Sequence, residues 1–376
     1  MTQFYVGLMS GTSLDGVDAV LVDFAGTGGA ALQVRGHAHR PFAPEVAAEL
    51  LLLNSPGENE LHRAGLAANA LARSFAQTVD ALLHATHISA GQVLAIGAHG
   101  QTVRHRPGEF DGIGYTLQLN NPALLAELTG INVVADFRSR DVAAGGQGAP
   151  LVPAFHRAVF ARAGETVAVV NIGGISNLTV LSPKGETQGF DCGPGNALLD
   201  HWCRTHTRHP FDDAGGWAST GDVIDTLLAI MLAEPYFSLA APKSTGRDLF
   251  NPAWLAARLS QMSQSAALRP QDVQATLSEL TARVCSDAVL RNALAARELL
   301  VCGGGAFNAD LMRRLAARMP GMTVLPTDAR GLPAHQVEAC AFAWLAREFH
   351  DRRSGNLSEV TGARGPRVLG ALYPSQ

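Results

Sequence analysis

Lysine is nearly absent from this chain, and its scarcity limits what the protein can bind. Lys184 and Lys243 are the two lysines among 376 residues, and arginine supplies the remaining basic side chains. The formal net charge is −4, and the sequence contains no run of basic residues. The composition therefore gives no electrostatic reason to expect nucleic acid or an anionic membrane surface as a partner.

Cysteine is also sparse, and its spacing excludes the common zinc and redox motifs. The five cysteines form no C-x-x-C pair. They are Cys192, Cys203, Cys285, Cys302 and Cys340. An odd number of cysteines without a disulfide framework suits a reducing compartment. No apolar run reaches the roughly 18 residues of a membrane-spanning helix, and no signal-peptide pattern precedes the first strand. We therefore expect a cytoplasmic protein.

The glycine triplet Gly303-Gly304-Gly305 lacks the spacing of the two best-known nucleotide-binding loops. It follows an apolar strand over 299–302 and precedes a helix over 309–319. It fits neither G-x-G-x-x-G nor G-x-x-x-x-G-K-[ST], and no lysine stands where a P-loop requires one. The pattern therefore disfavours Rossmann and P-loop folds. A triplet between strand and helix still allows the backbone to approach a flat group or a phosphate.

The chain starts with a polar, glycine-containing turn between two apolar runs. Residues 4–8 and 19–24 have strand length and are rich in β-branched and aromatic residues, so we expect a hairpin. The turn carries hydroxyls, glycines and carboxylates, namely Ser10, Gly11, Thr12, Ser13, Asp15, Gly16 and Asp18. Such glycines permit close approach to an anion, and the carboxylates suit a divalent metal beside it. The alternative is an ordinary hairpin turn.

The second half of the chain opens in the same way. Strands are expected over 166–172 and 178–181, and the turn between them contains Gly173, Gly174 and Asn177. This internal similarity predicts two domains of related topology. We expect their glycine turns to face each other across a cleft and to hold a polyphosphate there.

Polar side chains follow two buried-type strands of the first half. His99 and Gln101 come after a strand over 93–97, and Asp136 and Arg138 lie at the end of a strand over 131–137. In open α/β sheets, ligands bind just past the carboxyl ends of strands. We therefore expect these residues to contact a ligand. The alternatives are a structural hydrogen bond for His99 and an ion pair between Asp136 and Arg138.

The small-residue segment 143–150 follows, and we interpret it as a hinge or ligand loop at a domain boundary.

Asp191 is the strongest candidate for a general base. It ends a strand and is followed by Gly193-Pro194-Gly195, which should fix the carboxylate in place. A base must lie within hydrogen-bond reach of its proton, and burial raises a carboxyl pKa toward the working range. The alternative is that Asp191 caps the helix expected over 197–203.

Three acidic residues lie on helices of the second half. Glu338 lies on an otherwise apolar helix over 336–349, where it either pairs with an arginine or faces the cleft. Glu279 and Asp287 lie on a helix over 271–297, and we expect them on its solvated face.

Several motifs together resemble one family, the anhydro-N-acetylmuramic acid kinases of the actin, Hsp70 and sugar-kinase superfamily. The matching segments span nearly the whole chain: residues 7–18, 99–102, 136–150, 171–177, 191–196, 244–247 and 303–305, with Glu338. Two departures are Cys192, where threonine is more usual in the family, and Ala98, at a variable position. Neither removes a group that the chemistry needs.

The resemblance implies an α/β fold of two related actin-like, ribonuclease-H-like domains, each a mixed sheet flanked by helices. We expect one domain over 1–145, to which a tail over 355–376 returns, and a second over 146–354. It also implies a reaction in which ATP phosphorylates O6 of 1,6-anhydro-N-acetylmuramic acid while water opens the anhydro bridge. The product, N-acetylmuramic acid 6-phosphate, belongs to peptidoglycan recycling.

The resemblance also implies residue roles. Asp191 and Glu338 are the expected catalytic residues, and Asp15 and Asp18 the expected Mg²⁺ ligands. The residues expected to hold ATP are Gly11, Thr12, Ser13, Leu14, Asp15, Gly16, Val17, Asp18, Gly173, Gly174, Asn177, Gly303, Gly304 and Gly305. His99, Gln101, Asp136 and Arg138 are expected to bind the sugar, with the arginine suited to its lactyl carboxylate.

Three other functions compete with this interpretation. The first is a kinase for a plain sugar or hydroxy acid, which needs no anhydro bridge. The second is a sugar-sensing regulator, disfavoured because a strand opens the chain and the charge does not suit DNA. The third is an ATP-driven chaperone, disfavoured because no peptide-binding domain is visible. A homodimer is left open.

Overall fold

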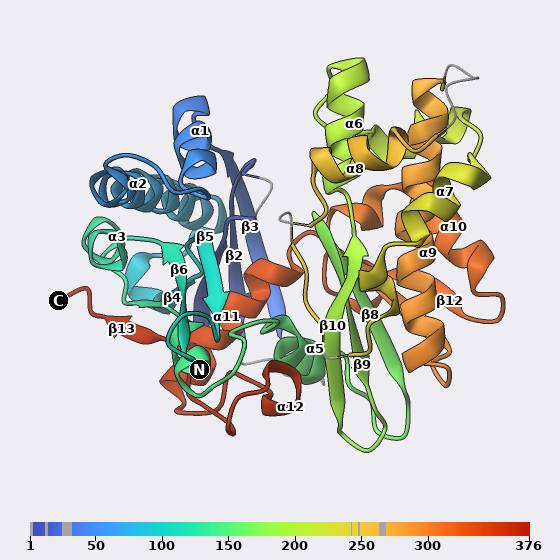
Figure 1. Ribbon diagram of the computed structural model, residues 1–376. Coiled ribbons are helices and arrows are strands. Elements are labelled where there is room, and N and C mark those ends of the chain that lie inside the picture. Colours follow the sequence, from blue (N-terminus) through green and yellow to red (C-terminus); the bar gives the residue numbers. More distant parts are fainter. Residues whose placement is uncertain (1–2, 12–13, 25–31, 242, 247–248, 263–267) are drawn as a thin grey trace. The chain divides into compact units, whose positions relative to one another are not determined.

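The computed structural model describes residues 3–11, 14–24, 32–241, 243–246, 249–262 and 268–376 (Figure 1). The chain forms two compact units. Unit 1 comprises Met1–Val159 and Gln336–Gln376, and unit 2 comprises Phe160–His335. The sequence placed the boundaries after residues 145 and 354. The observed boundaries differ from these positions. The helices next to the two points where the chain passes between the units, over 152–160 and 337–350, belong almost entirely to unit 1.

Unit 1 contains a six-stranded mixed sheet in the order β13-β7-β4-β1-β2-β3. Its strands are β1 (Phe4–Met9), β2 (Gly16–Asp23), β3 (Gln33–Pro41), β4 (Val93–Ala98), β7 (Val133–Ala135) and β13 (Ala371–Tyr373). β1, β2 and β3 are antiparallel neighbours, so the predicted opening hairpin is confirmed. β1, β4 and β7 run parallel, and β13 pairs antiparallel with β7.

A long helix covers one face of this sheet, and another helix lies against its central strands. α2 (Glu60–Thr86) packs on β2 and β3, and α11 (Val337–His350) packs on β1, β4 and β2. The other helices of unit 1 are α1 (Pro44–Leu52), α3 (Pro122–Thr129), α4 (Ser139–Ala143), α5 (Val152–Phe160), α12 (Ser358–Thr361) and the 3-10 turn η1 (Ala90–Gln92). The core between α2 and the sheet is apolar and includes Val6, Leu8, Leu71 and Phe75.

Two glycines allow α11 to lie directly on the strands. A Cβ atom on Gly7 would lie 1.9 Å from the carbonyl oxygen of Ala339, and one on Gly97 would lie 2.0 Å from that of Phe342. Any side chain at these positions would therefore push the helix off the sheet. This contact makes a C-terminal helix part of the core of the N-terminal unit.

A separate hairpin follows β4. It consists of β5 (Gln101–Pro107) and β6 (Gly114–Leu119), which pair only with each other among the described strands. Gln101, which the sequence placed just past the end of a strand, is thus the first residue of a further strand, β5. The connection after β4 is only His99-Gly100, and Gly100 takes a φ of +79° there.

Unit 2 repeats the architecture with a five-stranded sheet in the order β10-β9-β8-β11-β12. Its strands are β8 (Val167–Ile172), β9 (Ile175–Leu181), β10 (Thr187–Pro194), β11 (Glu298–Cys302) and β12 (Thr323–Pro326). β8, β9 and β10 form an antiparallel meander, and β8, β11 and β12 run parallel. These five strands match β1, β2, β3, β4 and β7 in order and direction. The predicted internal duplication and actin-like α/β fold are thus confirmed.

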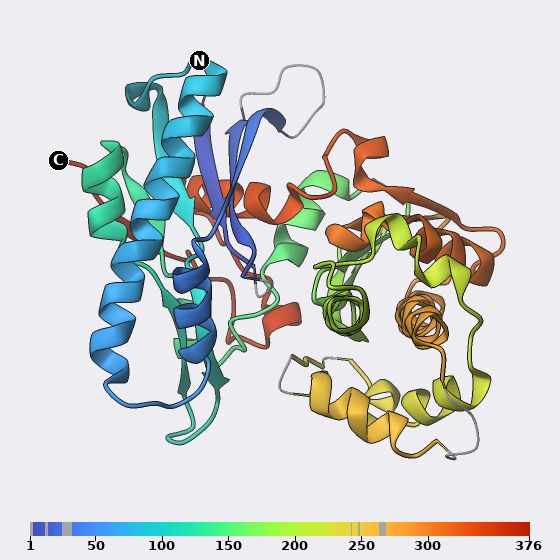
Figure 2. The ribbon, with the colours of Figure 1, turned by 90° about the horizontal axis from the view of Figure 1, so that it is seen from above.

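Unit 2 contains one long helix that several other helices contact. The helices of this unit are α6 (Ala197–Thr207), α7 (Asp225–Leu232), α8 (Pro252–Leu259), α9 (Pro270–Asn292) and α10 (Ala309–Arg318), with 3-10 turns η2 (Asp213–Gly215), η3 (Ala218–Thr220), η4 (Pro235–Ser238), η5 (Gly304–Phe307) and η6 (Thr327–Arg330). α9 contacts α6, α7, α10 and two strands (Figure 2).

The expectation that the charges of α9 lie on a solvated face is wrong. Glu279 accepts hydrogen bonds from Arg314 (3.0 Å) and Arg318 (3.4 Å), and Asp287 accepts one from Arg318 (3.2 Å). Most of the helix is buried, including polar residues such as Gln274 and Thr276. α9 is covered on several sides, so its charges form ion pairs with α10 instead of facing water.

Candidate functional site

In unit 1, parallel strands bring three predicted segments to one edge of the sheet. Leu8 pairs with Ala98, which pairs with Ala135, so the residues that follow β1, β4 and β7 lie at neighbouring strand ends. The Ser10 hydroxyl donates to Gln101 Oε1 over 2.9 Å. The first turn and the segment after β4, which are far apart in sequence, are therefore connected by a buried hydrogen bond.

Arg138 and His99 form a buried pair. Nε and Nη2 of Arg138 lie 3.1 and 2.9 Å from His99 Nε2. Because a guanidinium can only donate, His99 Nε2 must be the unprotonated acceptor. Burial and the charge of Arg138 hold the pKa of His99 well below its ordinary value, so the imidazole is neutral. His99 thus orients Arg138. This contact is a structural hydrogen bond of the kind that the sequence left open as an alternative for His99.

The charge of Arg138 is retained despite its burial. Burial lowers the pKa of Arg138 to about 10, while the negative charges of Glu338 and Asp141 act in the opposite direction. Nη1 donates to the carbonyl oxygen of Gly148 over 2.8 Å. Glu338 is half-buried in the first turn of α11. Its influence on Arg138 supports the arginine-pairing alternative that the sequence left open.

Asp141 fixes the segment that the sequence described as a hinge or ligand loop. Its Oδ1 accepts from Asn356 (2.6 Å) and Thr361 (2.7 Å), and its Oδ2 accepts from the backbone N–H of Gly148 (2.8 Å). The C-terminal segment therefore holds residues 143–150 inside unit 1, so they do not form the domain boundary. No signal in the sequence identified this partner, because Asn356 and Thr361 are more than 200 residues away.

Asp136 occupies an exposed position with a φ of +58°. Its Oδ1 accepts from the Ser139 hydroxyl (2.5 Å) and lies 3.4 Å from the backbone nitrogen of that residue. It therefore orders the first turn of α4, and among the described residues it forms no hydrogen bond or ion pair with Arg138. Its contact with a sugar stays a prediction.

Part of the first glycine turn lies outside the described residues, namely Thr12 and Ser13. Among the others, Leu14 takes a φ of +58°, and its backbone N–H donates to the Gly11 carbonyl over 3.2 Å. A Cβ on Gly16 would lie 2.3 Å from the carbonyl oxygen of Arg40, so β3 requires glycine there. Val17 is completely buried in the core, so it can offer a ligand only its backbone.

The two carboxylates of this turn differ in environment. Asp15 is exposed, whereas Asp18 Oδ1 lies 2.9 Å from His37 Nε2 and 3.1 Å from His39 Nδ1. Burial acts to raise the pKa of Asp18, but the hydrogen bonds and charges of the two histidines outweigh it and lower the pKa. Across the residues that the structure describes, no cluster of three or more His, Cys, Asp or Glu side chains could hold a metal ion.

In unit 2, the predicted segments converge at the carboxyl end of the central strand. Asn196 and Gly195 donate backbone hydrogen bonds to the carbonyls of Gly173 (2.8 Å) and Gly174 (3.0 Å). Gly303 takes a φ of +78°, and a Cβ there would lie 2.4 Å from Asn171 Oδ1. The second glycine turn, the Gly-Pro-Gly segment and the triplet through Gly305 thus form one group.

Asp191 stands in a row of residues across the sheet. It pairs with Asn177, which pairs with Asn171, which pairs with Cys302 immediately before the triplet. The strand register shifts between Asp191 and Gly193, so a bulge follows the carboxylate. The predicted general base and the predicted phosphate residues therefore lie at the same edge of the unit 2 sheet.

The Asp191 side chain is mostly buried and accepts one backbone hydrogen bond. The N–H of Thr245 donates to its Oδ2 over 3.0 Å. Burial raises the pKa of Asp191 to about 6, against the opposing effects of that hydrogen bond and of Lys243. The alternative of a helix cap is wrong, because α6 begins at Ala197 with Asn196 in the cap position. A mostly buried carboxylate with a raised pKa at a strand end suits a general base, and that role stays a prediction.

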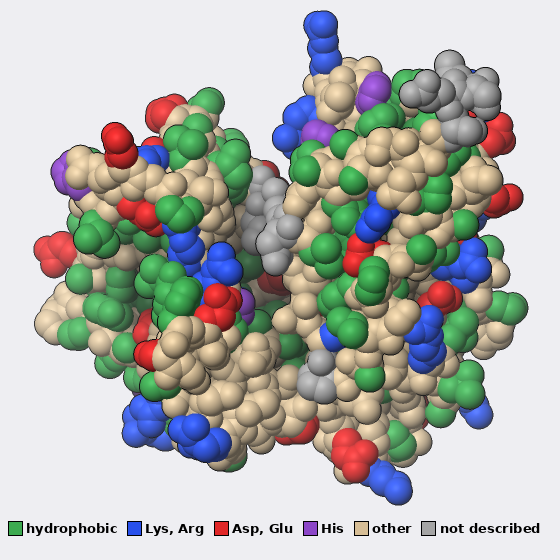
Figure 3. All heavy atoms as spheres, in the orientation of Figure 1, with side chains coloured by type: hydrophobic (Ala, Val, Ile, Leu, Met, Phe, Trp, Pro, Cys, Tyr) green, Lys and Arg blue, Asp and Glu red, His purple; other side chains and the backbone are tan. Residues whose placement is uncertain are grey.

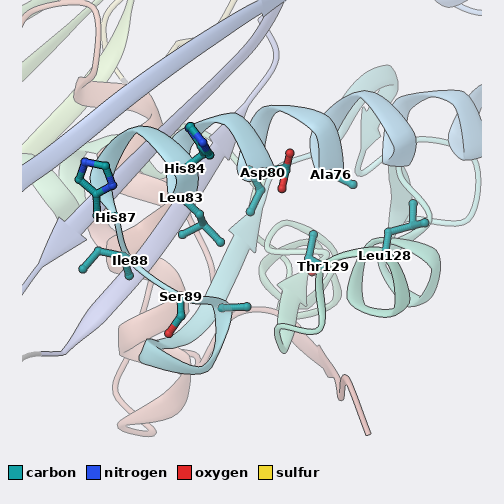
Figure 4. A pocket seen from close by; sticks show the side chains of 11 residues that line it. Ala76, Asp80, Leu83, His84, His87, Ile88, Ser89, Leu128 and Thr129 are labelled. Carbon is teal, nitrogen blue, oxygen red and sulfur yellow. The ribbon is translucent and has the colours of Figure 1, made fainter.

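A cavity of about 480 Å³ lies elsewhere in unit 1 (Figure 4). It is lined by α2, the end of α3 and the segment before β4, including Asp80, His84, His87 and Leu128. That segment enters β4 at its amino end, whereas the predicted residues follow the carboxyl ends of the strands. None of the predicted site residues lines this cavity.

On the face shown in Figure 3, acidic and basic side chains are interspersed. Within the described part of the chain, every helix is too short or too polar to span a bilayer.

Comparisons with known proteins cover almost the whole chain. The family model for anhydro-N-acetylmuramic acid kinase matches residues 3–375. An anhydro-N-acetylmuramic acid kinase of Variovorax paradoxus is 62% identical over 378 residues, covering 99% of both chains. Those of Albidiferax ferrireducens and Cupriavidus pinatubonensis are 58% and 59% identical, covering 100% and 98% of both chains. The chain therefore belongs to the anhydro-N-acetylmuramic acid kinase family.

Proposed function

We propose that this protein uses ATP to phosphorylate O6 of 1,6-anhydro-N-acetylmuramic acid while water opens the anhydro bridge, giving N-acetylmuramic acid 6-phosphate for peptidoglycan recycling. Family membership over residues 3–375 supports the substrate and the phosphoryl donor. The observation that carries the chemistry is the buried Asp191 carboxylate, whose pKa is raised to about 6.

The reaction needs a base that accepts a proton from water near neutral pH. Asp191 takes that proton as the water oxygen attacks the anomeric carbon. The bond from this carbon to O6 breaks, and O6 keeps the electron pair and receives the γ-phosphoryl group, releasing ADP. A base works best when its pKa lies near the operating pH. Thr245 Oγ1, buried beside Asp191 and without a hydrogen-bond partner among the described residues, could bind this water or the sugar.

The glycine turns support the ATP site. We assign the phosphates to Gly11, Leu14 and Gly16 of unit 1 and to Gly173, Gly174 and Asn177 of unit 2. Thr12 and Ser13, which lie outside the described residues, are included in the unit 1 assignment. Gly303, Gly304 and Gly305 are assigned to the adenosine. A Cβ at Gly173 would meet no atom closer than 3.7 Å, so its backbone is accessible to a ligand.

Mg²⁺ fits the chemistry of the first turn in part. Asp15 and Asp18 supply carboxylate oxygens, and Mg²⁺ is usually held by one or two carboxylates together with phosphates and water. His37 and His39 contact Asp18 Oδ1, and Asp15 is exposed to solvent. The ion would neutralise charge on the triphosphate.

We assign the sugar to the unit 1 edge. Arg138 suits the lactyl carboxylate, because a guanidinium can form two parallel hydrogen bonds with a carboxylate. His99 holds Arg138 in place, and Gln101 and Asp136 would contact polar groups of the sugar. The catalytic role predicted for Glu338 becomes an electrostatic one in this proposal, since it acts on Arg138.

The test is to incubate the protein with ATP, Mg²⁺ and the anhydro sugar in ¹⁸O-labelled water. We expect a product heavier than the substrate by one phosphoryl group and one water, with ¹⁸O at the anomeric carbon. A plain sugar without an anhydro bridge serves as the competing substrate. Faster phosphorylation of that sugar, without solvent oxygen in the product, would favour the competing kinase function.

Location and assembly are separate parts of the proposal. We place the protein in the cytoplasm, which agrees with five buried cysteines, none of which is part of a disulfide. Whether it forms a homodimer is tested by light scattering during gel filtration.

A further inference from the structure

A segment that is described over 235–241 and 243–246 holds Asp191 from three directions. The Tyr236 hydroxyl donates to the Asp191 carbonyl oxygen over 2.8 Å. The Asp191 N–H donates to the Lys243 carbonyl over 3.1 Å, and the Thr245 N–H donates to its carboxylate. Both the backbone and the side chain of the base therefore depend on a segment that lies outside its own sheet.

The ammonium group of Lys243 forms hydrogen bonds with the beginning of the same segment. Its Nζ donates to the carbonyl oxygens of Tyr236 (3.2 Å) and Phe237 (3.4 Å), and it lies 4.6 Å from the centre of the Tyr236 ring. Phe237 in turn stacks on Phe250, with ring centres 5.5 Å apart. One end of the segment is thus fixed in the core, and Lys243 ties the other end to it.

Few ionisable groups lie near Lys243 and Asp191. Burial lowers the pKa of Lys243, Cys192 and Asp191 act to raise it, and Arg291 of α9 acts to lower it. Around Asp191, the ionisable neighbours are Lys243, Tyr236 and Cys192, and Cys192 in turn contacts Cys285 of α9. Lys243 is the only one of these groups whose charge favours the ionised carboxylate of Asp191.

We propose that Lys243 is a positioning residue, which fixes the Asp191 carboxylate by tying Tyr236 to the segment that donates to it. This inference rests on the proposed role of Asp191 as base. Lys243 acts through neutral carbonyls and through its charge and need not touch the substrate. Replacing it should therefore move both the rate and the pH at which the base ionises.

The test compares Lys243→Met, Lys243→Arg and wild type across pH 4.5–9. Lys243→Met should lower kcat roughly tenfold through misplacement of the base. It should also move the acid limb of kcat/KM up by about one pH unit, because a neighbouring positive charge is lost. Lys243→Arg should restore the acid limb. Tyr236→Phe should lower kcat and leave the limb in place.

The second lysine of the chain gives a matched control. Lys184 is exposed in the β9–β10 turn, so Lys184→Met should match wild type in rate and pH profile. Circular dichroism and thermal unfolding identify any variant that fails to fold. If Lys243→Met does not fold, the rates and pH profiles of Lys243→Arg and Tyr236→Phe still test the inference. A Lys243→Met profile equal to that of wild type would overturn the inference.

A measurement without turnover separates this inference from the proposed function. The Asp191 carboxyl can be titrated by NMR after ¹³C labelling of aspartate, with Asp191→Asn identifying its signal. Lys243→Met should raise the measured pKa whether or not the protein phosphorylates the anhydro sugar. An unchanged titration overturns the inference about Lys243, whereas failure of the labelled-water experiment overturns only the proposed reaction.

Discussion

Asp18 and Asp191 belong to the same part of the repeated sheet and differ in what faces them. In unit 1, Asp18 of β2 pairs with His39 of β3. In unit 2, the corresponding strands are β9 and β10, where Asn177 pairs with Asp191. Each sheet thus places one carboxylate on its second or third strand, close to the glycine turn.

The partners give the two carboxylates opposite properties. Burial acts to raise the pKa of both, but His37 and His39 outweigh it at Asp18 and lower the pKa. At Asp191 one backbone N–H and Lys243 do not outweigh it, and the pKa rises to about 6. The two carboxylates are therefore not equivalent in the duplication, since Asp18 lies on β2 and Asp191 lies on β10, the counterpart of β3. Their neighbouring side chains leave one pKa lowered and the other raised.

The largest expected effect comes from removing the base. Asp191→Asn should lower kcat by a factor of roughly 10² or more, because the activated water is lost. ATP affinity should change little, since the glycine turns are intact. Steady-state kinetics with titration of ATP binding would measure both. Turnover near that of wild type would remove Asp191 from the mechanism.

Arg138 should give the next largest effect. Arg138→Gln should raise the KM for the sugar by about 10- to 100-fold, because a hydrogen bond to a charged group is lost. Arg140→Gln is the matched control, since Arg140 is exposed two residues away. Equal KM values for the two variants would show that Arg138 does not bind the carboxylate.

Asp18 should affect the metal and not the base. Asp18→Asn should raise the Mg²⁺ concentration needed for half-maximal rate by about tenfold, the lower range for losing a ligand contact. At saturating Mg²⁺, kcat should remain within a few-fold of wild type. A hundredfold fall in kcat at saturating Mg²⁺ would show that Asp18, like Asp191, is needed for the chemical step.

Stability should show the same contrast with the smallest effects. Above pH 6 the wild type bears the cost of an ionised, buried Asp191, so Asp191→Asn should be more stable at pH 8 by about 1–2 kcal/mol. The gain should disappear by pH 4, where the carboxyl is protonated in the folded state. Urea unfolding at both pH values measures it.

Asp18 should show the opposite sign. Because its pKa is lowered on folding, its contribution is present above the unfolded value and lost as pH falls. Asp18→Asn should therefore be less stable than wild type at pH 8, by no more than about 1 kcal/mol for this partly exposed pair. Stabilisation by this variant at pH 8 would contradict the assigned environment of Asp18.

Local patterns were enough to predict most of the fold. Strand-length apolar runs and the repeated glycine turn predicted both hairpins and the duplication, because these signals are contained in short segments. The burial of α9 was not predictable in this way. Its polar residues, such as Thr276 and Glu279, indicate a solvated face until the helices that cover them are known.

The same limit applies to the site. Asp191 was recognisable because a strand end and a rigid turn are local features. The hydrogen bonds that tune it come from Tyr236 and Thr245, about 50 residues away, and no periodicity reports them. The Asp141 contacts with Asn356 and Thr361 likewise depend on a chain segment that returns from the far end of the sequence.

The position of α11 in the sequence has a consequence for synthesis on the ribosome. The helix that covers β1 and β4, against Gly7 and Gly97, is encoded after the whole of unit 2. Once residues up to 335 have left the ribosome, unit 2 can fold, while the sheet of unit 1 still has an apolar face that α11 does not yet cover. Unit 2 is thus expected to mature first, and a premature stop before α11 would expose a surface that chaperones bind.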